Sequence, residues 1–161
     1  MVRPSPIIIP PTSKLTYIGG MAALNLPSST GTGDWHQEQT FFHSRTKRSR
    51  SFISGKGCPT DTLEMLGDAG IYDCTSVLKV LGIPHEGTTA FAASHARATA
   101  DLVLDAVMRG ESPDFAVLDD WMPRTSDKQE VIELLAKALE RLTPEQQATI
   151  RAWIDKNVAQ K

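Results

Sequence analysis

The residues best suited to chemistry lie in one short polar segment, Asp34-Trp35-His36. Asp34 and His36 are two positions apart, so on a β-strand their side chains would share one face. A carboxylate and an imidazole placed together can transfer a proton or hold a metal, with His43 or Cys58 as further ligands. However, these residues lack the short paired spacings that are typical of zinc sites. We therefore favour a structural role, in which Asp34 caps a turn and Trp35 packs beneath it.

A basic cluster follows this segment. Four cations within six positions can bind phosphates, and the neighbouring phenylalanines could stack on bases. No helix-turn-helix signature accompanies the cluster, and arginine is also enriched at protein interfaces. Contact with nucleic acid and contact with a protein therefore both stay open. The cluster consists of Arg45, Lys47, Arg48 and Arg50.

A third polar group lies in an alanine-rich stretch of predicted helix. Arg97 and Asp101 are four positions apart, which predicts an ion pair that faces solvent. His95 borders a surface of small residues, where a packing role is expected. Six positions separate His95 from Asp101 and place them on different faces of the helix, which disfavours a catalytic pair.

Several familiar signatures of enzymes and cofactor sites are missing from the sequence. It has no Gly-x-x-x-x-Gly-Lys-Ser/Thr loop, no His-Glu-x-x-His, no Gly-x-Ser-x-Gly and no Cys-x-x-Cys. Its two cysteines are too few for a disulfide framework. We therefore expect a protein that is not an enzyme and needs no metal or other cofactor.

The charge of the chain is unevenly distributed. Of 161 residues, 40% are hydrophobic and 22% charged, which is ordinary for a globular protein. Residues 1–58 carry seven Lys or Arg and two acidic residues, a net charge of +5, so residues 59–161 carry −7. Such polarity can attract charged partners to each part of the chain. No apolar stretch is long enough for a membrane span, so a cytoplasmic protein without membrane contact is expected.

The helices and strands expected from the sequence, which must position these residues, indicate an α+β fold. Four prolines and the Ser and Thr residues between and after them mark residues 1–13 as a flexible arm. A single α+β domain is expected over residues 14–161, with strands and loops in 14–58 and helices in 59–161. Alternating patterns predict a small antiparallel sheet. Its expected strands are residues 14–18, 21–26, 36–42 and 51–53.

About five or six helices are expected in the C-terminal two-thirds. Their starts are marked by capping residues and their ends by glycines or prolines. The longest should run from about Thr89 to Arg109, before Gly110. The others are expected after Asp61, over 74–81, over 114–121, from Ser126 to about Leu142, and from Pro144 to about Val158 behind a Thr143 cap.

Several short motifs resemble a group of small proteins from bacterial mobile elements. They are the run LTYIGG at residues 15–20, ALNLP at 23–27, TGDWH at 32–36, GDAGI at 67–71 and HARATAD at 95–101. The resemblance covers about residues 14–142. This chain departs from it in the basic segment up to Lys56 and in the added C-terminal helix.

The resemblance implies the antitoxin half of a bacterial toxin-antitoxin pair. Such a protein neutralises a cognate toxin by direct contact, and nucleotidyltransferase-like toxins are among the partners implied. The motif segments 32–36, 67–71 and 95–101 are expected to converge on one surface. The expected partner-binding residues are Asp34, Trp35, His36, Arg45, Lys47, Arg48, Arg50, His95 and Arg97.

Two other functions stay open. A nucleic-acid-binding transcriptional regulator would use residues 45–50, and an antitoxin can also bind its own promoter DNA. A small metal- or histidine-dependent hydrolase or transferase would use Asp34, His36 or His43. Homo-oligomerisation is compatible with each of these functions.

Overall fold

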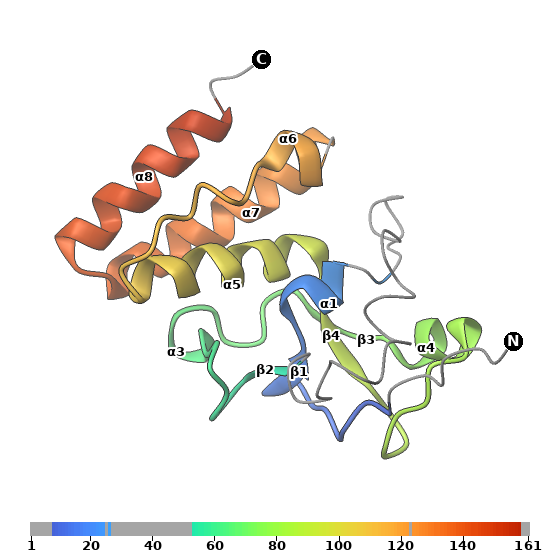
Figure 1. The fold of residues 1–161 in the computed structure, drawn as a ribbon. Helices are drawn as coiled ribbons and strands as arrows, with labels where there is room; N and C mark the ends of the chain where they lie inside the picture. The colour runs from blue at the N-terminus through green and yellow to red at the C-terminus, as the bar shows by residue number, and fades with distance from the viewer. Residues whose placement is uncertain (1–7, 25, 27–52, 123, 159–161) are drawn as a thin grey trace, which may run out of the picture.

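A computed structural model describes residues 8–24, 26, 53–122 and 124–158 of the chain (Figure 1). These residues form an α+β fold with a four-stranded mixed sheet and seven α-helices. The sheet is built from residues 16–93 with helices interleaved, and a helical C-terminal part follows. The α+β class predicted from the sequence is therefore confirmed.

The sheet has the strand order β2-β1-β4-β3. The central strand β1 pairs antiparallel with β2 and parallel with β4, where Ile18 is opposite Ala92. β4 in turn pairs antiparallel with β3. The strands are β1 (Thr16–Ile18), β2 (Ile53–Gly55), β3 (Ile71–Asp73) and β4 (Phe91–Ala93).

This sheet corrects the prediction of an antiparallel sheet confined to the N-terminal third. Two of its strands, β3 and β4, come from the stretch that was predicted to be helical throughout. Alanine favours helix and is depleted in strands, but here the completely buried Ala92 and Ala93 fill the crowded centre of the sheet. Tertiary pairing therefore overrides the local helical preference.

A second correction concerns residues 21–26, which were predicted to form a strand. They largely form helix α1 instead, which begins at Gly20 with φ of 58°. The buried Ala22 and Ala23 suit a helix that packs against α5. The predicted strand 36–42 lies outside the described residues, and of 51–53 only Ile53 is described, where it begins β2.

Helix α5 is the centre of the molecule. In Figure 1 it lies between the sheet with α1 and the C-terminal helices α6, α7 and α8. All of its residues are buried except Leu102 and Met108. A helix buried on every side must satisfy any polar residue internally. The helices are α1 (Gly20–Leu24), α3 (Leu63–Leu66), α4 (Thr75–Leu81), α5 (His95–Met108), α6 (Leu118–Trp121), α7 (Thr125–Ala138) and α8 (Pro144–Val158), with a 3₁₀ turn η2 at Leu139–Arg141.

Several helix starts agree with the sequence prediction. Asp73 accepts hydrogen bonds from the Thr75 backbone and hydroxyl before α4, and Gly82 ends that helix with φ of 74°. Thr143 and Gln146 bond each other's backbone N–H groups at the start of α8. This reciprocal cap explains why α8 begins at Pro144 as predicted.

Other predicted boundaries are wrong. The long helix begins at His95 rather than Thr89, because Ser94 accepts a hydrogen bond from the Arg97 N–H and caps it after β4. Only residues Leu118–Trp121 of the predicted helix 114–121 are helical. α7 begins at Thr125, one residue before the predicted Ser126, and Arg124 at its N-cap makes no side-chain cap bond.

Among the described residues, no helix is both long enough and apolar enough to cross a bilayer.

Candidate functional site

Arg97 and Asp101 form an ion pair in the interior of the protein. Arg97 Nε lies 2.8 Å from Asp101 Oδ1, and both side chains have zero exposed surface. The expected solvent-facing pair is therefore wrong in its environment although right in its partners. The spacing of four residues explains why Arg97 and Asp101 pair, whereas the elements packed on both sides of α5 explain why the pair is buried.

Two hydroxyl groups complete this pair. Tyr17 Oη on β1 donates to Asp101 Oδ2 at 2.5 Å, and Thr62 Oγ1 donates to Asp101 Oδ1 at 2.6 Å. Each hydroxyl also accepts a hydrogen bond from Arg97 Nη2, at 3.1 and 3.0 Å. The guanidinium carbon lies 5.4 Å from the centre of the Tyr17 ring. Burial, reinforced by the Asp101 carboxylate, raises the pKa of the Tyr17 hydroxyl and keeps it a donor.

Backbone carbonyls satisfy the rest of the guanidinium. Arg97 Nη1 donates to Gly67 O at 2.9 Å and to Ala69 O at 2.5 Å. With Asp101, Tyr17 and Thr62, these carbonyls give one acceptor for each of the five N–H groups of an arginine. Such a saturated cluster offers no donor to an outside ligand, so we assign it a structural role.

Two of the three segments that were expected to converge, 67–71 and 95–101, meet at this cluster. Gly70, with φ of 76°, lies so close to α5 that a Cβ atom there would stand 2.7 Å from Arg97 Cβ. The segments 67–71 and 95–101 therefore converge, in the interior rather than on a surface. The third segment, 32–36, lies outside the described residues.

His95 is the first residue of α5 and is also buried. Its Nε2 lies 2.6 Å from the carbonyl oxygen of Leu26, just after α1. Burial lowers the pKa of His95, and the Leu26 carbonyl and the Asp127 carboxylate oppose that shift. The expected packing role is compatible with this position. We do not retain the buried Arg97 among the residues for partner contact.

Most of the other predicted site residues lie outside the described part of the chain. Asp34, Trp35, His36, His43 and the basic cluster 45–50 all lie outside the described residues. Cys58, the remaining candidate ligand, is half-buried, and burial raises the pKa of its thiol. Within the described parts of the chain, no three His, Cys, Asp or Glu residues lie close enough to hold a metal ion.

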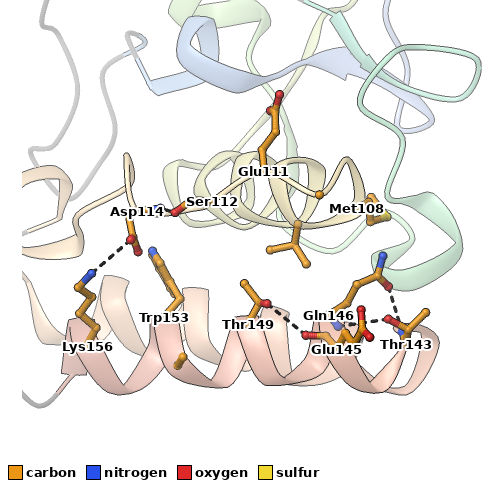
Figure 2. A pocket seen from close by; sticks show the side chains of 13 residues that line it. Met108, Glu111, Ser112, Asp114, Thr143, Glu145, Gln146, Thr149, Trp153 and Lys156 are labelled. Carbon is orange, nitrogen blue, oxygen red and sulfur yellow. Dashed lines mark hydrogen bonds and ion pairs between the residues drawn. The ribbon is translucent and has the colours of Figure 1, made fainter.

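A groove between the end of α5 and α8 is a feature that the sequence did not predict. Its volume is about 630 Å³, and Val107 and Trp153 form its apolar base. Figure 2 shows Thr143, Thr149 and Trp153 along α8, and Met108, Ser112 and Asp114 across from them. The remaining lining residues are Gly110, Glu111, Glu145, Gln146, Ala152 and Lys156.

The base of the groove is held rigidly. Trp153 Nε1 donates to the carbonyl oxygen of Ala116 at 3.0 Å, and Asn157 Oδ1 accepts from the Leu118 N–H at 2.9 Å. These bonds tie α8 to the segment that links α5 with α6. One end of the groove is closed by an ion pair of 3.3 Å between Lys156 and Asp114 (Figure 2).

Exposed apolar side chains accompany the groove. Met108 is 37% exposed on its edge, and Phe115 and Val117, in the segment after Asp114, are 52% and 36% exposed. Val117 also lines a smaller cavity of about 80 Å³ that shares Asp114 and Lys156 with the groove. The sequence signal was present, because Pro113 to Val117 carries apolar residues that the short helix α6 does not absorb. The pattern of this segment predicts a helix over 114–121, of which only Leu118–Trp121 is helical.

No protein-family model matches this sequence, and no curated protein or solved structure is significantly similar to it.

Proposed function

We propose that this chain is an antitoxin-like binding protein that neutralises a cognate toxin by direct protein-protein contact, without catalysis of its own. The observation that carries the proposal is the groove between α5 and α8 with the exposed Met108, Phe115 and Val117 beside it. Exposed apolar side chains at a groove with polar lining residues are typical of surfaces that bind other proteins. The motif resemblance adds the toxin-antitoxin context, in which nucleotidyltransferase-like toxins are candidate partners.

The saturated Arg97 cluster supports the same proposal. Its charged and hydroxyl groups could serve chemistry if a substrate reached them, but each Arg97 N–H already has a protein acceptor. In a binding protein, such a cluster fixes the scaffold on which the contact surface is built. On this proposal, the resemblance segments 67–71 and 95–101 contribute to function by stabilising this scaffold.

The test is co-expression with the product of the neighbouring gene. We expect a stable complex by affinity purification and relief of that product's toxicity in growing cells. Replacing Met108 and Phe115 by Ala should weaken the complex about tenfold, as for truncation of an apolar anchor. A matched control replaces Val80 and Leu15 by Ala, because these residues are 86% and 52% exposed and lie elsewhere on the protein.

The proposal is abandoned if the wild-type chain neither binds the neighbouring product nor relieves its toxicity. It is also abandoned if the control pair weakens the complex as much as the Met108 and Phe115 pair does. The second result would mean that a general loss of apolar surface explains the effect.

A further inference from the structure

Outward and inward side chains alternate along the segment that links α5 with α6. Phe115 and Val117 are exposed, whereas Ala116 and Leu118 are buried. Val117 has φ of −120° and ψ of 110°, which is extended backbone, and in extended backbone successive side chains point to opposite sides. The direction of the two exposed side chains is therefore set by whatever holds the residues between and after them.

The start of α6 needs an acceptor from outside its own helix. Before it, the Ala116 N–H donates to the carbonyl oxygen of Pro113 at 3.1 Å and closes a turn. Val117, the N-cap residue of α6, makes no side-chain cap bond. The first N–H groups of a helix have no partner within the helix, so the buried Leu118 N–H must find its acceptor elsewhere. α8, which lies alongside this segment in Figure 1, supplies it.

Two side chains of α8 bond to the backbone on either side of Val117. Trp153 Nε1 donates to the carbonyl oxygen of Ala116 at 3.0 Å, and the Leu118 N–H donates to Asn157 Oδ1 at 2.9 Å. Asn157 Nδ2 donates to the Trp153 carbonyl oxygen at 2.9 Å, which orients the amide. All three bonds are buried, where a lost partner leaves an unsatisfied polar group. Asn157 thus caps α6 from another helix.

We propose that Trp153 and Asn157 are positioning residues, through which α8 acts as a strap that keeps Phe115 and Val117 turned outward for the partner protein. This inference rests on the proposed function and names what holds part of its contact surface in place. A segment that is ordered before binding loses less conformational entropy when it binds. Affinity should therefore depend on Trp153 and Asn157, although both side chains are buried.

Hydrogen exchange on the free full-length protein tests the strap. Asn157→Ala removes the acceptor of the Leu118 N–H, and Trp153→Phe removes the indole N–H while it keeps an aromatic ring. Each variant should raise the exchange rates of the amides in residues 116–121 about tenfold or more, as for loss of a buried hydrogen bond. The exchange rates in α5 should stay unchanged.

The matched control breaks hydrogen bonds at the other end of α8. Gln147 Nε2 donates to the carbonyl oxygens of Leu139 and Leu142, at 2.8 and 3.2 Å. Gln147→Ala should therefore leave exchange in residues 116–121 as in the wild type. An equal rise in this control, or a rise of the same size in every helix, would overturn the inference, because either result indicates general destabilisation.

Binding to the product of the neighbouring gene shows whether the strap acts through the outward side chains. Trp153→Phe should weaken the complex about two- to tenfold, and Gln147→Ala should not. In a chain that already carries Phe115→Ala and Val117→Ala, adding Trp153→Phe should have no further effect, because the contacts that it positions are gone. The same loss of affinity in both backgrounds would contradict the inference.

Together the two measurements separate this inference from the proposed function. If exchange in residues 116–121 rises and the affinity falls as expected, both stand. If exchange rises but the affinity is unchanged, or if exchange does not respond, the inference fails while binding by the wild-type chain still supports the proposed function. If the wild-type chain does not bind, the proposed function fails, and the positioning role falls with it whatever the exchange rates are.

Discussion

Arg97 shows at the residue scale how a charge is kept inside this protein. Its guanidinium reaches a carboxylate four residues along the same helix, two hydroxyls from other elements and two backbone carbonyls. Removing two charges from water costs several kcal/mol, which is recovered only where each donor and acceptor is bonded. Breaking one member therefore costs more than an exposed ion pair would.

Replacing Asp101 by Asn tests this cost. The variant keeps the shape of the side chain but leaves the buried guanidinium without its counter-charge, and we expect a loss of about 3–5 kcal/mol in the free energy of unfolding. Tyr17→Phe is the milder companion and should cost about 1.5–3 kcal/mol, because it removes the hydrogen bond to Asp101 and leaves one Arg97 N–H without its acceptor. Urea denaturation measures both losses.

The control for these variants is Lys156→Gln. It removes an ion pair whose two side chains are more than half exposed, so the change should stay below about 1 kcal/mol. A loss from Asp101→Asn that is no larger than this would contradict the structural role assigned to the cluster.

His95 gives a prediction for acid pH. Burial lowers its pKa below 6.5 in the folded state, so the unfolded chain takes up this proton first. Its contribution to stability is therefore intact above about pH 6.5 and is lost as the pH falls through the folded pKa. An NMR titration of the imidazole should show a pKa under 6.5. Asp127→Asn should lower it further, since Asp127 favours the charged form; an unchanged or higher value would contradict this prediction.

At the residue scale, the sequence predicted that Arg97 and Asp101 pair, but it did not predict that the pair is buried. A spacing of four residues fixes which side chains meet on a helix, so the Arg97 and Asp101 pair could be foreseen. Tyr17 and Thr62 lie 84 and 39 residues from Asp101 along the chain, and no local pattern connects them. Burial of the pair followed from those distant contacts.

At the scale of elements, the sequence predicted helix starts correctly where the capping hydrogen bonds join neighbouring residues. The Thr143 and Gln146 cap of α8 and the Asp73 cap before α4 were readable because each forms within three residues. β4 was missed because its existence depends on β1 and β3 on either side of it. The groove escaped prediction for the same reason, since its walls come from helices separated by more than thirty residues.

The turn before β3 carries a prediction at this scale. Gly70 has φ of 76°, and a Cβ atom there would lie 2.7 Å from Arg97 Cβ and 3.1 Å from Ser94 Oγ. Gly70→Ala should therefore push the turn away from α5 and disturb the carbonyl of Ala69. Gly82→Ala is the matched control, because Gly82 has φ of 74° with nothing within 4 Å of its Cβ position.

Backbone strain alone should cost Gly82→Ala about 1–2 kcal/mol. Gly70→Ala should exceed the control by a further 1–3 kcal/mol or so, as for overpacking of a core. Thermal unfolding of the two variants gives the difference. Equal losses of stability in the two variants would mean that the close approach of Gly70 to Arg97 does not contribute to the cost of the substitution.

At the scale of the whole molecule, the α+β class could be predicted from alternating and helical periodicities, whereas the topology could not. The parallel pairing of β1 with β4 brings together residues 18 and 92, which are separated among the described residues by three helices, α1, α3 and α4, and two strands, β2 and β3. Short strands of three residues leave little periodic signal. The order of the strands in the sheet therefore depends on contacts between distant residues, which no local sequence pattern indicates.

Two buried titratable groups in the sheet region determine how the stability of the protein changes at high pH. Burial raises the pKa of Cys74 to about 12, and it raises the pKa of Tyr72 to about 12 as well. Both groups keep their protons in the folded protein after the unfolded chain has lost them. Stability should hold up to about pH 9 and then fall, by up to about 1.4 kcal/mol per pH unit for each group.

Urea denaturation between about pH 8 and pH 11 measures this slope. Cys74→Ala should make the decline shallower, whereas Cys58→Ala should change it less, because Cys58 is only half-buried. A decline of the same steepness in the Cys74 variant would contradict the assignment to that thiol.

Arg97 also constrains the order in which the chain acquires its structure. The pair with Asp101 can form within one stretch of helix, but the bonds from Tyr17 require that β1 has arrived. A collapsed intermediate that enclosed α5 without β1 would trap charged groups with unmade hydrogen bonds. Such an intermediate is disfavoured, so β1 and α5 should consolidate in one cooperative step and their amide hydrogens should exchange with the same opening free energy.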